Sequence, residues 1–313
     1  MARRRKWLIV ASVALSLALA ACSGGGHTPA PAPSPTRTFP LTVTDDDGVS
    51  VQLRAAPRRI VTWAPSNTEI LFAIGLGSRV VGVSGPFDDY PPAARSITQV
   101  GGAGGITPDI EKVVSLRPDL VLNGFEGGDD WKHQLRGLGI PVFSIYATTL
   151  GDALHDIRTV GQVTGAQRQA FALAASMQRR IDAVTRAVST QQLVSCFFES
   201  YYPPLTTIGP NTFIFDILRR AGCAPVSGEA NGDYPQWSVD KLVRNPPNVY
   251  LAASESASSV QAVQKRPGFD GILAVHEGHV FLVDSDLITR PGPRVVQALQ
   301  DLARDLHPSA FAA

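Results

Sequence analysis

Short apolar stretches alternate along this chain with segments whose apolar residues recur at intervals of three and four. Strands are predicted at 59–64, 79–84, 119–124 and 141–147, and helices at 68–75 and 131–139. Strands that alternate with helices predict parallel sheets flanked by helices, an α/β fold. Before them, 42–53 predicts a strand-turn-strand hairpin with Asp47-Gly48 at its turn.

The three aspartates of this hairpin, Asp45, Asp46 and Asp47, raise the alternative of a calcium loop. The ligands that such a loop needs at its later positions are missing from the sequence. We therefore interpret the aspartates as turn chemistry.

Three segments of the first half recur in the same order in the second half. The pairs are 67–70 with 211–214, 83–91 with 226–235, and 110–122 with 239–251, the last without a gap. A repeat of this length predicts two lobes of the same topology, residues 39–165 and 190–313.

The segment between the lobes, 166–189, predicts one long amphipathic helix. Its apolar stripe consists of Phe171, Ala174, Met177, Ile181, Val184 and Val188. We expect a single rigid connection between the lobes, with a ligand cleft where the ends of their parallel strands face each other.

The N-terminus has the features of a secretory signal. Residues 1–21 contain a basic stretch and an apolar run, and Leu19-Ala20-Ala21-Cys22 resembles the bacterial lipobox. Residues 22–38 are rich in Gly, Pro, Ser and Thr, which is typical of a flexible tether. We expect a lipid on Cys22 that anchors an extracytoplasmic protein to the bacterial cell membrane; the alternative is an ordinary signal peptide with a chance cysteine.

Charge and cysteine content narrow the function. Without the four basic residues of the signal, the formal charge of +1 becomes about −3, which leaves no basic footprint for nucleic acid. Cys196 and Cys223 lie in a compartment that permits disulfides. A disulfide between them fits a strand followed by a helix whose end returns toward the start of the strand. The alternative is two buried free thiols.

The loops that follow the predicted strands supply the candidate lining of the cleft. The first lobe offers Phe87, Tyr90, the glycine-rich loop 101–105, Phe125 and Trp131, and the second offers Tyr201, Tyr202, Tyr234, Trp237, Asp286 and Arg290. Flat aromatic rings suit a bulky, partly apolar ligand. The alternative is that about half of these rings cap the cores of the lobes.

Catalytic and metal-binding patterns are weak. The sequence has no Gly-x-Ser-x-Gly elbow, and His276 and His279 flank a Glu-Gly turn signal instead of sharing a helix face. We therefore expect neither an enzyme nor a metal site nor a resident cofactor.

Several segments along the chain together resemble one protein family. In order, they are the lipobox, the segment 59–84, DYPP at 89–92, EKVVSLRPDLVL at 111–122, YYPPLTTIG at 201–209, DYPQWS at 233–238 and LITRPGPR at 287–294. The family is the helical-backbone class of ABC-importer substrate-binding proteins, which serves vitamin B12, ferric siderophores and haem. The similarity is greatest to the vitamin-B12-binding branch.

The resemblance implies a monomer that captures a corrinoid and delivers it to an ABC permease and its ATPase. The ligand positions that it implies are Phe87, Phe125, Tyr202, Tyr234, Asp286 and Arg290. The sequence departs from the pattern at Ala103, where vitamin-B12 binders can present a large aromatic residue, and at Phe125, where a tryptophan is expected. These departures leave the exact ligand open. The alternatives are a ferric siderophore or haem, an extracytoplasmic enzyme, and a surface sensing module without a transporter.

Glu69 has two candidate roles. With Ser66 it forms the pattern of a helix capping box. By the resemblance, an acid on each lobe inserts into an arginine pocket of the permease, and Glu69 is the matching acid of the first lobe. For the second lobe we favour Asp216 over Glu229.

Overall fold

The first sheet carries the N-terminal half of the fold in a computed structural model that describes residues 38–102 and 107–312. Its parallel strands are β3 (Ile60–Trp63), β4 (Val80–Gly82), β5 (Leu120–Asn123) and β6 (Val142–Ser144), in the order β4-β3-β5-β6. Its helices are α1 (Pro65–Ala73), α2 (Ile110–Ser115) and α3 (Asp129–Gly137), with short 3-10 turns at Gly77–Arg79 and Pro92–Ser96. The lipobox, the expected lipid site Cys22 and the loop residue Ala103 lie outside the described residues.

The second sheet repeats this topology. It consists of β7 (Val194–Glu199), β8 (Cys223–Pro225), β9 (Val249–Ala253) and β10 (Val280–Val283), in the order β8-β7-β9-β10. Its helices are α6 (Phe213–Arg220), α7 (Val239–Arg244), α8 (Val260–Gln264), α9 (Leu273–His276) and α10 (Ser285–Ile288), with a 3-10 turn at Phe269–Gly271. The α/β fold and the internal repeat predicted from the sequence are therefore confirmed.

The predicted hairpin is also present, as an antiparallel pair outside both sheets. Its strands are β1 (Leu41–Thr44) and β2 (Ser50–Leu53), and Gly48 turns the chain with a φ of 75°.

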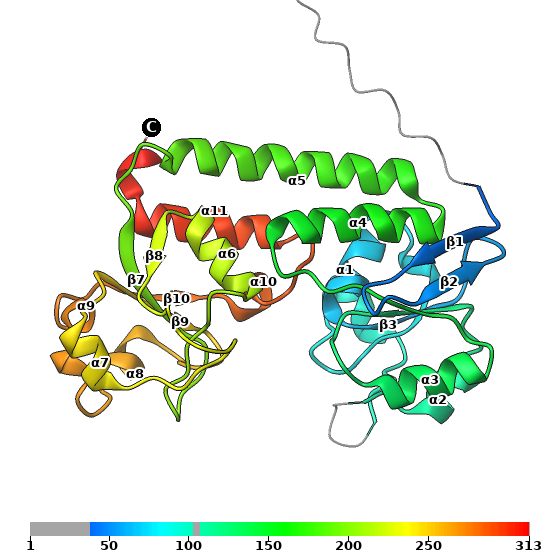
Figure 1. Cartoon of the computed structure of the whole chain (residues 1–313), viewed down its shortest axis with the longest axis horizontal. Helices are drawn as coiled ribbons and strands as arrows, with labels where there is room; N and C mark the ends of the chain where they lie inside the picture. Colours follow the sequence, from blue (N-terminus) through cyan, green and yellow to red (C-terminus); the bar gives the residue numbers. More distant parts are fainter. Residues whose placement is uncertain (1–37, 103–106, 313) are drawn as a thin grey trace, which may run out of the picture. The chain divides into compact units, whose positions relative to one another are not determined.

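The long helix α5 (Gln167–Val188) extends over both lobes, with α4 (Leu150–Thr164) beside it over the first and α11 (Val295–Leu306) beside it over the second (Figure 1). The connecting helix predicted at 166–189 is α5, which buries Ala170, Ala174, Met177, Ile181, Val184 and Val188. Phe171, predicted on the buried stripe, is half-buried, and the smaller Ala170 takes its place at the contact with Gly161 of α4. α4 and α11 pack against α5, so neighbouring helices support this connection.

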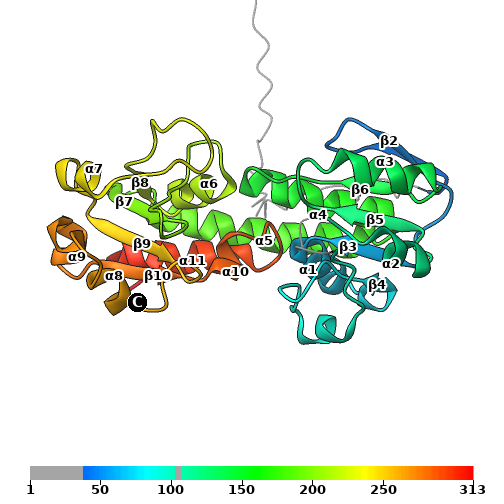
Figure 2. The ribbon, with the colours of Figure 1, turned by 90° about the horizontal axis from the view of Figure 1, so that it is seen from below.

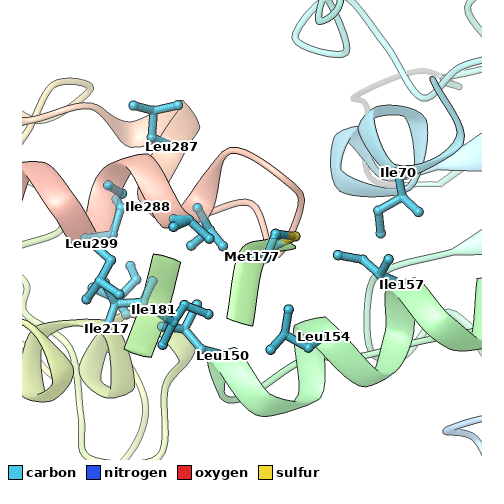
Figure 3. Packing of buried hydrophobic residues seen from close by; sticks show 14 of the residues in the cluster. Ile70, Leu150, Leu154, Ile157, Met177, Ile181, Ile217, Leu287, Ile288 and Leu299 are labelled. Carbon is cyan, nitrogen blue, oxygen red and sulfur yellow. The ribbon is translucent and has the colours of Figure 1, made fainter. Parts of the chain in front are cut away.

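The core formed by these helices is continuous from one lobe to the other. Figure 3 shows its centre, where Met177 and Ile181 of α5 lie between side chains of both lobes. Residues of α1, α4, α6, α10 and α11 contribute, among them Ile70, Leu150, Leu154, Ile157, Ile217, Leu287, Ile288 and Leu299. Because each fully buried side chain of this size contributes about 1.5–3 kcal/mol, the helical layer holds the two sheets in place.

Two further features complete the fold. Cys196 of β7 and Cys223 of β8 form a disulfide across neighbouring strands, so the bridged alternative holds. Within the described ranges 38–102 and 107–312, no helix is long and apolar enough to span a membrane.

Asp156 gives the helical layer a pH-dependent stability. Its carboxyl is buried in α4, and burial, followed by the negative charges of Asp46 and Asp152, raises its pKa from 3.8 to about 8. The folded protein therefore keeps a proton that the unfolded chain releases. Stability should fall as the pH rises from about 4 to about 8, by up to about 1.4 kcal/mol per pH unit.

Asp156→Asn should remove this slope, because the amide is neutral in both states. We expect the variant to be more stable than the wild type at pH 8 and nearly equal to it at pH 4, measured by urea unfolding across this pH range. Parallel stability curves for the two proteins would contradict the assignment.

Candidate functional site

A cavity of about 590 Å³ opens between the carboxyl ends of the two sheets. The first lobe lines it with Ala64–Ser66 after β3, Phe87 after β4, Gly124–Glu126 after β5 and Tyr146–Thr148 after β6. The second lobe adds Asn211–Phe213, Asp233, Tyr234, Glu255, Asp286 and Thr289–Pro291. Ligands of parallel α/β sheets bind at these strand ends, and the volume is typical of a small-molecule site. Figure 2 shows the two sheets from below, with the strand ends of both lobes.

Five of the eight predicted ligand residues line this cavity: Phe87, Phe125, Tyr234, Asp286 and Arg290. The three rings are 48%, 47% and 61% exposed, although large apolar side chains are normally buried. Exposed rings gathered around one cavity mark a binding surface.

The other three predicted residues do not line the cavity. Tyr202 packs edge-on against Phe269, with ring centroids 5.6 Å apart, and Trp237 packs against Phe197 of the second-lobe core at 6.2 Å. Tyr90 lies beside the cavity with its ring under the Arg294 guanidinium, 3.8 Å away. None of the three is among the residues that line the cavity, and a ligand contact by their rings stays a prediction.

Tyr146 is the main lining residue that the sequence reasoning missed. It lies two residues after the end of β6, as Phe125 lies two residues after β5, so the same strand-end rule could have selected it. Glu126 and Glu255 were missed as well, since isolated acids in loops carry no pattern of their own.

The charge of the lining is mainly negative. Glu126, Asp233, Glu255 and Asp286 face one described cation, Arg290. That guanidinium hydrogen-bonds to Asp286 and lies 3.6 Å from Glu69 Oε1. The one cation among the described lining residues therefore already lies beside carboxylates of the protein.

Comparison with known proteins identifies the fold. The family model described as "Periplasmic binding protein" matches residues 60–287, most of the chain. The chain belongs to this family of periplasmic binding proteins. The resemblance predicted from the sequence is thereby confirmed at the level of the family.

Individual relatives of this periplasmic binding protein differ in their ligands. The chain is 32% identical to the uncharacterized ABC transporter substrate-binding lipoprotein YvrC of Bacillus subtilis over 281 residues, covering 87% of each. It is 30% identical over 276 residues to a cobalamin-binding protein of Halobacterium salinarum, covering 86% of this chain and 74% of that protein. The heme-binding protein RhuT from Roseiflexus sp. RS-1 superposes with a TM-score of 0.71 at 27% identity, covering 81% and 99%.

Glu69, predicted to dock into the permease, is buried between the two lobes. Its side chain is 1% exposed and accepts two hydrogen bonds from Arg294, at 3.0 Å from Nε and 2.6 Å from Nη2. The predicted capping box is wrong. α1 begins at Pro65, so Ser66 lies inside the helix instead of at its N-cap.

The arginine loop of the second lobe, residues 289–294 between α10 and α11, thus reaches the first lobe twice. Arg294 binds Glu69, and Arg290 Nη2 donates to the backbone oxygen of Phe87 at 2.9 Å. The loop that lines the cavity is also the loop that joins its two walls.

Asp216, the predicted docking acid of the second lobe, also has partners within the chain. Its Oδ2 accepts hydrogen bonds from Arg220 Nε and from the backbone N–H of Leu150, both at 2.8 Å. It therefore caps the start of α4.

Glu69→Gln should destabilise the protein, because Arg290 and Arg294 would keep their charge without a buried carboxylate beside them. We expect the free energy of unfolding to fall by about 3 kcal/mol. Asp301→Asn is the control, since it breaks the exposed pair with Arg304 and should cost less than about 1 kcal/mol. Chemical unfolding of both variants measures the difference, and equal losses would refute a buried interlobe ion pair.

Proposed function

We propose that this periplasmic binding protein captures a corrinoid such as vitamin B12 in the cavity between its lobes and delivers it to an ABC permease. The proposed ligand class rests on one observation, the combination of exposed aromatic rings and excess carboxylates around the cavity. A corrinoid suits this lining, because its periphery is rich in neutral amides and its cobalt-corrin centre carries positive charge.

Haem and ferric siderophores are the alternative ligands. Haem carries two propionates, and many ferric siderophore complexes are anionic. Such ligands need unpaired cations, while Arg290 already contacts Asp286 and Glu69. The cobalamin-binding relative supports the corrinoid, and the heme-binding structure keeps haem as the competing ligand.

The transport partners follow from the relatives. YvrC is described as an ABC transporter substrate-binding lipoprotein, so we expect a permease and an ATPase as partners and a lipid on Cys22 as the anchor. Docking of Glu69 and Asp216 stays part of the proposal. Because both carboxylates have partners within the chain, docking requires the permease arginines to replace those partners.

Calorimetric titration with cyanocobalamin, haemin and ferric siderophores tests the ligand class. We expect saturable binding of cyanocobalamin at micromolar concentration or below, and weaker binding of the anionic ligands.

Variants locate the binding in the cavity. Phe125→Ala and Tyr234→Ala should each weaken binding about tenfold or more, since each ring contributes apolar contact area. Leu138→Ala, at an exposed leucine outside the cavity, is the matched control and should leave the affinity unchanged. Tight haemin binding without cyanocobalamin binding would overturn the corrinoid proposal.

A further inference from the structure

All three aspartates of the β1–β2 turn bind the end of β6. Asp45 Oδ2 accepts the backbone N–H of Ser144 at 3.2 Å, and Asp46 Oδ2 accepts that of Tyr146 at 2.6 Å. Asp47 Oδ2 accepts the Ser144 hydroxyl at 2.7 Å. The aspartates that the sequence assigned to turn chemistry therefore fix a segment that ends in the cavity.

A buried lysine completes the contact at Asp47. The Lys132 side chain of α3 is 0% exposed, and its Nζ lies 2.8 Å from Asp47 Oδ2 and 3.3 Å from the Tyr146 hydroxyl. The Tyr146 hydroxyl donates to Asp47 Oδ1 at 2.6 Å. Burial would raise the pKa of Asp47, but hydrogen bonds from Lys132, Tyr146 and Ser144 lower it to about 2, so the carboxylate stays charged.

The contacts continue from Tyr146 to Phe125. Asn123 Nδ2, at the end of β5, lies 3.2 Å from the Tyr146 hydroxyl and donates to the Phe125 backbone oxygen at 2.8 Å. Asn123 Oδ1 accepts the Phe125 N–H at 3.1 Å. One chain of hydrogen bonds thus runs from the hairpin to two residues of the cavity wall.

We propose that Tyr146 is a ligand-contacting residue, and that Asp47 and Lys132 are positioning residues that hold Tyr146 and the Phe125 loop in place. Removing a lysine and its partners from water is costly, and such pairs seldom add net stability. That cost is consistent with a role in fixing the geometry of the wall. The hairpin lies outside the matched range 60–287, so the wall depends on a segment that the family model does not include.

This inference rests on the proposed ligand-binding function, so its test separates the two. The probe is cyanocobalamin, titrated into the full chain and into Asp47→Asn, Tyr146→Phe and the double variant. We expect each single variant to weaken binding about three- to tenfold, as loss of one positioning hydrogen bond should. The double variant should bind cyanocobalamin no more weakly than the weaker-binding single variant, because both substitutions remove the same hydrogen bond.

Asp301→Asn is the matched control, because it makes the same change at an exposed aspartate that pairs with Arg304 and does not line the cavity. It should leave the cyanocobalamin Kd within about twofold of the wild type. Equal effects of Asp301→Asn and Asp47→Asn on Kd, or none from Tyr146→Phe, would overturn the positioning role.

If the wild type binds no cyanocobalamin, that result refutes the proposed function but not the positioning role. Hydrogen exchange measured without ligand then tests the positioning role. Asp47→Asn should then speed exchange at the Phe125 amide while leaving the amides of α5 unchanged. Unchanged exchange at Phe125 would overturn the inference.

Discussion

The apolar face of α5 is the constraint on which the rest of this structure depends. Met177 and Ile181 pack between helices that belong to both sheets, so the two lobes share one core. The carboxyl ends of both sheets meet at one cavity, because the shared core holds each sheet against the same helical layer. Large hinge opening would expose part of this core, so we expect small lobe movements instead.

Charged contacts join the two lobes in addition to the shared core. The arginine loop 289–294 of the second lobe contacts Glu69 and Phe87 of the first, and Arg290 lies beside the carboxylates of Glu69 and Asp286. The contacts that join the walls thereby leave the cavity lining with an excess of carboxylates. One loop thus joins the lobes and sets the charge of the cavity lining, and Asp47 of the hairpin accepts a hydrogen bond from the Tyr146 hydroxyl.

Features with a local or repeated pattern could be predicted from the sequence. The stripe on α5, the internal repeat and the strand-end residues Phe87, Phe125 and Tyr234 are of this kind. The ion pair of Glu69 could not be predicted, because its partner Arg294 lies 225 residues away, and no local pattern reports that contact. Tyr202 and Trp237 follow the same loop rule as Tyr234, yet their rings turn into the second-lobe core, and only tertiary packing decides which way a ring turns.

The central claim is that the ligand lies between the two lobes and touches both. A crystal structure with cyanocobalamin tests it most directly, because the anomalous signal of cobalt marks the ligand position independently of any fitted model. The account predicts a cobalt peak inside the cavity, with the corrin in contact with Phe87 or Phe125 of the first lobe and Tyr234 of the second. A peak on an outer surface, or a corrin in contact with one lobe alone, would contradict it.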